Sequence, residues 1–112
     1  MGIFGGPSNQ VLNQMALGIA SVFLQHRMLS ELDDVARNEA VQKMKEEGSP
    51  VDRTELVKMV SEVINEEKLG WHSRSKFLTM IYGHLVSAGL STTEAFNVRE
   101  DIRNYYKLIG SR

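Results

Sequence analysis

Apolar residues recur at intervals of three and four along almost the whole chain, and this spacing constrains the fold more than any other feature. The clearest example is the stripe formed by Leu12, Met15, Ile19, Val22, His26 and Leu29. Such spacing places residues on one side of an α-helix, whereas a half-buried strand needs strict alternation of apolar and polar residues. Only two prolines interrupt the 112 residues. The sequence therefore predicts an all-α fold, a single-domain bundle of four to five helices.

Capping residues divide the chain into five predicted helical segments. The glycines and the proline near the amino terminus predict a flexible Gly-rich arm over residues 1–8, followed by a single helical domain over residues 9–110. The expected amino-terminal caps are Ser8 or Asn9, Ser30 with Asp33, Ser49 with Pro50 at the first helical position, Ser73, and Ser91 with Glu94. Glycines are expected to end the last four helices at positions 48, 70, 89 and 110.

Each predicted helix has an apolar face. In the first helix Val11, Leu17, Phe23 and Leu24 widen the stripe, so this helix should be buried on more than one side. The inward residues expected in the other helices are Leu32, Val35, Ala36, Ala40, Val41 and Met44, then Leu56, Val57, Val60, Val63 and Ile64, then Phe77, Leu78, Ile81, Leu85 and Val86, and finally Ala95, Val98, Ile102, Tyr105 and Ile109.

The residues that carry most enzyme chemistry are missing or badly spaced. The chain has no cysteine, which excludes disulfides, thiolate zinc sites, iron–sulfur clusters and cysteine nucleophiles. None of His26, His72 and His84 has a second histidine or a carboxylate at the helical spacing of a metal site, and no glycine-rich phosphate-binding motif is present. We therefore expect no enzyme activity, no catalytic residues, no cofactor and no metal.

Charge is distributed unevenly along a chain whose formal net charge is only −1. Residues 1–30 carry Arg27 alone, residues 31–69 have six basic and eleven acidic side chains for −5, and residues 70–112 have six basic and three acidic for +3. Regions of opposite charge can attract one another between copies or select the charged surface of a partner. They can equally face each other within one monomer.

One segment resembles a helix-turn-helix. From His84 to Val98 the chain has a Gly89-Leu90-Ser91 turn followed by apolar residues at the spacing of that motif, within a predicted hairpin over residues 74–109. The resemblance implies DNA contacts by Thr92, Thr93, Asn97, Arg99, Arg103 and Lys107. Leu85 departs from the motif, which favours a small residue at that position. An ordinary helical hairpin could have the same residues in its turn and at its apolar positions.

No membrane segment is expected. The first 26 residues carry no charged side chain, but the most apolar stretch, Met15 to Leu24, has ten residues where a membrane span needs about 20. A signal peptide would need a basic region before residue 9. These observations place the protein in the cytoplasm, or in the virion if its source is viral.

The prediction for function is a non-enzymatic protein–protein interaction module: a small adaptor, assembly factor or regulator that self-associates, of cellular, viral or phage origin. The apolar surface of the uncharged first helix is wider than the other helices of so small a bundle would cover. We therefore expect part of it to remain exposed as an apolar patch that binds a protein partner. The expected interaction residues are Ile3, Phe4, Leu12, Met15, Ile19, Val22 and Phe23. The alternative is a helix-turn-helix transcriptional regulator that binds DNA through the hairpin.

Overall fold

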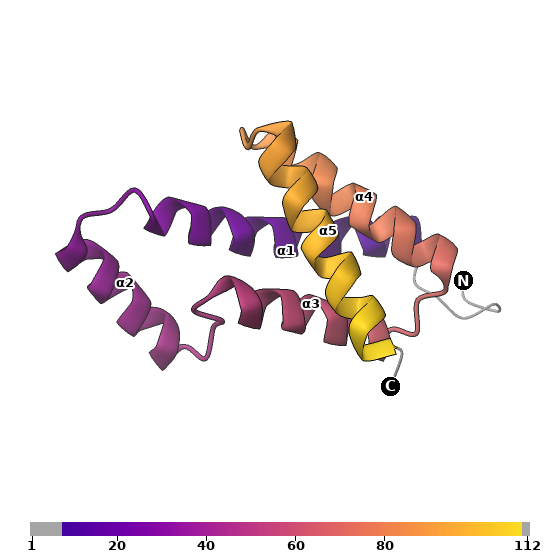
Figure 1. Ribbon diagram of the computed structural model, residues 1–112, viewed down its shortest axis with the longest axis horizontal. Helices are drawn as coiled ribbons and strands as arrows, with labels where there is room; N and C mark the ends of the chain where they lie inside the picture. The colour runs from indigo at the N-terminus through magenta and orange to yellow at the C-terminus, as the bar shows by residue number, and fades with distance from the viewer. Residues whose placement is uncertain (1–7, 111–112) are drawn as a thin grey trace.

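The computed structural model describes residues 8–110 and contains five α-helices in this part of the chain, with no strand among them (Figure 1). The helices are α1 (Asn9–Leu29), α2 (Asp34–Glu46), α3 (Arg53–Glu66), α4 (Trp71–Ser87) and α5 (Thr92–Gly110). The all-α prediction is confirmed. The expected arm over residues 1–8 lies, apart from Ser8, outside the described residues. No helix within residues 8–110 is long and apolar enough to cross a membrane.

Four helices build the core. α1 packs against α4, α4 against α5, and α3 against both α5 and α1. The predicted apolar faces of α3, α4 and α5 supply most of the buried side chains, as expected from their helical spacing. The largest fully buried ones are Phe77, Leu12, Leu56, Ile64, Ile81, Leu85 and Ile102. The side chain of Ile109 lies outside the description.

α1 contributes to the core through a stripe narrower than predicted. Ala16 and Ala20 are fully covered, and small residues at such positions let neighbouring helices approach closely. Val11 and Leu17, which widen the stripe in the sequence, are exposed in the structure. Their places at the two margins of the stripe explain this difference, because the helices packed against α1 do not reach that far around it.

The prediction that α2 turns an apolar face into the core is wrong. None of its 13 residues is buried, and Figure 1 shows it at the far end of the molecule, away from α4 and α5. Leu32 and Val35 are exposed, while Ala36, Ala40, Val41 and Met44 are only half-buried. The physical reason is that the other four helices close the core without α2, and the two alanines of this stripe bury little apolar area.

Two caps agree with the sequence. The backbone N–H of Val11 donates to Ser8 Oγ at 3.3 Å at the start of α1. At the start of α5 the N–H of Glu94 donates to Ser91 Oγ at 3.1 Å, and Ser91 Oγ lies 3.4 Å from Glu94 Oε1. This pairing is the predicted capping box.

The other three predicted caps are wrong by three residues. Asp33, not Ser30, caps α2 by accepting from Ala36 N–H at 2.8 Å, because the Ser30 hydroxyl donates to Arg27 O at the end of α1. Asp52, not Ser49, caps α3 by accepting from Glu55 N–H at 2.8 Å. Here Pro50 is still outside the helix, and its carbonyl oxygen lies 2.9 Å from His26 Nε2. α4 begins at Trp71 after Gly70, two residues before Ser73 and without a side-chain cap.

Residues 30–51 form what we call the α2 excursion, which comprises α2 and the segments that join it to α1 and α3. A 13-residue helix with no buried residue is marginally stable in water, since most helical stability in proteins comes from tertiary packing. The excursion is anchored at its base, where His26 at the end of α1 meets Pro50 before α3.

We therefore expect the amide hydrogens of α2 to exchange with solvent faster than those of α4 by two or more orders of magnitude. Hydrogen-exchange measurements on the native protein, resolved by residue, would check this expectation. The amides of α1 at Ala16 to Ala20, which have the same kind of helical hydrogen bonds but lie in the core, are the internal control. Equal protection of α2 and α1 would show that α2 is packed far more firmly than its exposure indicates.

Candidate functional site

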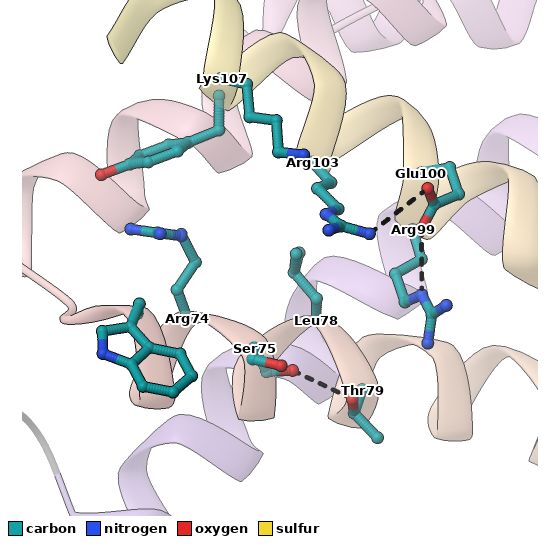
Figure 2. A pocket seen from close by; sticks show the side chains of 10 residues that line it. Arg74, Ser75, Leu78, Thr79, Arg99, Glu100, Arg103 and Lys107 are labelled. Atoms are coloured by element: carbon teal, nitrogen blue, oxygen red, sulfur yellow. Dashed lines mark hydrogen bonds and ion pairs between the residues drawn. The ribbon is translucent and has the colours of Figure 1, made fainter.

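The candidate site is a cleft of about 400 Å³ between the first half of α4 and the second half of α5, shown in Figure 2. We call it the basic cleft. Arg74 rises from α4 on one side, and Arg103 and Lys107 project from α5 on the other. The residues that line it are Trp71, Arg74, Ser75, Leu78, Thr79, Arg99, Glu100, Arg103, Tyr106 and Lys107.

An antiparallel pairing of α4 with α5 brings these side chains together. Gly89 has a φ of +111° in the connection between the two helices, a backbone conformation that favours glycine. The Arg74 guanidinium lies 4.6 Å from the centre of the Tyr106 ring, and the Arg99 guanidinium 5.6 Å from that of Tyr82. Each of these pairs joins residues about equally far from the turn, as expected of an antiparallel hairpin.

Cations dominate the electrostatics of the basic cleft. It holds four basic side chains and one carboxylate, Glu100, for a net charge of +3. Glu100 lies between two of these cations, with Oε2 at 3.5 Å from Arg99 Nε and Oε1 at 3.8 Å from Arg103 Nη1. Its Oε2 atom is buried and makes no hydrogen bond within the described chain. The carboxylate thus lies close to both arginines without neutralising the cleft.

Aromatic and apolar groups complete the site. Trp71 stands at the start of α4 with 67% of its surface exposed, and its ring stacks on that of His72 at 3.7 Å between centroids. Leu78 is a buried residue at the wall of the cleft. A hollow that combines cations with an exposed aromatic ring suits an anionic ligand that also carries apolar groups.

The structure places most of the predicted protein-interaction residues inside the protein. Leu12, Ile19 and Phe23 are buried in the core, and Met15 and Val22 are half-buried against it. Ile3 and Phe4 lie outside the described residues. Substituting Ile19 or Phe23 by a polar residue would therefore disturb this chain's own packing, and surfaces available to a partner consist of other side chains.

The predicted DNA-contacting residues separate into groups. Arg99, Arg103 and Lys107 follow one another at intervals of four and share the basic cleft. Thr92 and Thr93 are exposed at the start of α5. Asn97 lies about 160° around the helix from Arg99, since each residue advances an α-helix by about 100°.

Asn97 instead lines a second pocket, where α1, α3 and α5 meet, together with Arg27 and Glu94. The charges there are paired, because Arg27 Nε lies 2.9 Å from Glu94 Oε2. We regard this junction as structural, since its ionic groups already have partners.

Sequence analysis missed the α4 side of the basic cleft, namely Trp71 and Arg74, and it also missed Tyr106 on α5. A signal for them was present in the chain. In an antiparallel hairpin that turns at residues 89–91, Arg74 lies opposite Tyr106, so folding the sequence about that turn would have placed them beside Arg103 and Lys107.

Comparisons with family models, curated proteins and solved structures found no match to the chain. Within residues 8–110, no three His, Asp or Glu side chains are grouped so that they could hold a metal ion.

Proposed function

We propose that this protein is a non-enzymatic interaction module, an adaptor or assembly factor of the cytoplasm or the virion, that binds an acidic segment of a protein partner in the basic cleft. The observation that carries the proposal is the convergence of four cations from two helices on one hollow that contains a single carboxylate. Arginine offers planar, fixed donor geometry to carboxylates, and Trp71 at the rim offers apolar contact area.

A peptide fits this cleft better than a DNA duplex does. Three evenly spaced cations on α5 are compatible with phosphate contacts, which is the observation in favour of the DNA alternative. A recognition helix must enter the major groove, yet here α4 and α5 form an antiparallel hairpin in which Arg74 and Tyr106, both far from the turn, are in contact. The helices of a helix-turn-helix instead cross at about 90–120°. Asn97, the residue suited to reading adenine, is on a different side of α5 from the arginines.

The sole tryptophan of the chain supplies a direct test, because Trp71 lines the cleft. We expect a synthetic Glu-rich peptide to change the Trp71 fluorescence on binding, and the affinity to fall as salt rises from about 50 mM to about 500 mM. The double variant Arg103→Gln, Lys107→Gln should weaken binding at least about tenfold, since charge-assisted hydrogen bonds contribute about 1.5–3 kcal/mol each.

Lys58→Gln on the exposed surface of α3 is the matched control and should leave the affinity unchanged. A duplex oligonucleotide forms the second arm of the experiment. Tight, sequence-selective duplex binding at physiological salt, with no binding of the peptide, would replace this proposal by the DNA alternative. Peptide binding that survives the loss of both cations would show that the cleft is not the binding site.

A further inference from the structure

Ion pairs within the chain increase the contrast between its two charged regions. The acidic residues of α5 are all used internally: Glu94 pairs with Arg27 at 2.9 Å, Asp101 with Arg53 at 2.6 Å, and Glu100 with its two neighbouring arginines. Among the described residues, the three arginines of the basic cleft thus have no ion pair with an acidic residue other than Glu100. The surface around the cleft is more positive than the residue count of α5 indicates.

The α2 excursion has the opposite character. It carries six acidic and three basic side chains, a net charge of −3, against +3 in the basic cleft. Glu39, Glu46 and Glu47 are exposed and make no ion pair within the described chain. The excursion and the cleft lie toward opposite ends of a molecule whose extents are 50 × 29 × 25 Å (Figure 1), so they do not meet within one copy.

The exposed face of α2 matches the cleft in spacing as well as in charge. Val35, Glu39 and Glu46 follow at intervals of four and seven, so they lie along one side of the helix. Glu39 and Glu46 are about 10 Å apart along the helix axis, and Arg99 and Lys107 are about 12 Å apart along theirs. Val35, with 69% of its surface exposed, adds an apolar group that could cover Trp71.

We propose that the partner segment bound in the basic cleft is the α2 excursion of a second copy of this chain. This inference rests on the proposed function, since it names the acidic segment which that function requires. The contact joins two different surfaces, and each copy offers one of each. It also explains why α2 leaves its outer face without a partner in the monomer: that face is completed between copies.

Two complementary variants test the proposal. The cleft variant carries Arg103→Glu and Lys107→Glu, and the excursion variant carries Glu39→Lys and Glu46→Lys. Size-exclusion chromatography with light scattering should show that the wild-type mass rises with concentration, while each variant alone stays monomeric. Mixed together in equal amounts, the two variants should associate again, because one supplies the intact excursion and the other the intact cleft.

Controls keep each outcome interpretable. Lys58→Glu and Glu62→Lys on α3 reverse exposed charges outside both surfaces and should associate as the wild type does. Circular dichroism checks that every variant folds, and Arg103→Gln with Lys107→Gln replaces the cleft variant if charge reversal unfolds it.

A wild type that stays monomeric at high concentration, or variants that fail to rescue each other, would overturn the inference about the partner. Binding of the Glu-rich peptide in the same preparations would leave the proposed function standing, whereas loss of both activities would remove the two proposals together.

Discussion

Replacing Phe77 by alanine is expected to lower the free energy of unfolding by about 3 to 5 kcal/mol. Phe77 is the largest fully buried side chain, on the helix that packs against both α1 and α5. Its removal leaves a cavity that the surrounding helices cannot fill without moving. Since small domains are stable by only about 5–15 kcal/mol, a large fraction of the stability would be lost.

Urea denaturation followed by circular dichroism would measure this change. Phe96→Ala is the matched control: Phe96 is 46% exposed, and its main specific contact is the Arg99 guanidinium at 4.9 Å from the ring centre. That substitution should reduce stability by less than about 1 kcal/mol. Comparable losses for the two phenylalanines would contradict the core described above.

Gly89→Ala is expected to destabilise the protein by about 1 to 3 kcal/mol, because a residue with a Cβ atom is strained at unusual backbone dihedrals. Space is not the cause, since a Cβ atom at Gly89 would meet nothing within 4 Å; the cause is the φ of +111°. This turn sets the pairing of α4 with α5, and the basic cleft depends on that pairing.

Gly83→Ala is expected to change the stability of the protein in the opposite direction. Gly83 lies in the interior of α4, and a Cβ atom there would also meet nothing within 4 Å. Alanine should stabilise the helix by about 0.5–1 kcal/mol, because it reduces the backbone entropy of the unfolded chain. Thermal melts of the two variants should shift in opposite directions, and shifts of the same sign would mean that backbone conformation at position 89 does not limit stability.

The helices and most core residues could be predicted because they depend on local periodicity. The spacing of Phe77, Ile81 and Leu85 defines a buried face wherever the helix is placed. Helix starts were predicted less well, since several polar residues compete to cap each one. Asp33 caps α2 because the Ser30 hydroxyl already donates to a carbonyl at the end of α1. Asp52 caps α3 because Pro50 lies before that helix begins.

The packing of the helices against one another determines which apolar stripes are buried and which distant residues meet, and local sequence pattern does not. The stripe through Ala40 and Met44 is helical and apolar, but whether a stripe is buried depends on what packs against it. The basic cleft shows the same limit: the interval of four between Arg99, Arg103 and Lys107 is visible in the sequence, whereas Arg74 joins them only through the pairing of α4 with α5.

The hydrogen bond between His26 and Pro50 closes a loop of chain whose ends are separated by 24 positions in the sequence. The free energy of closing a flexible loop grows only slowly with its length, so this segment can be lengthened, shortened or exchanged at little expense to the remaining four helices. Insertions between α1 and α3 are therefore expected to change the surface that this end of the molecule offers to a partner, while the fold of the other four helices stays the same.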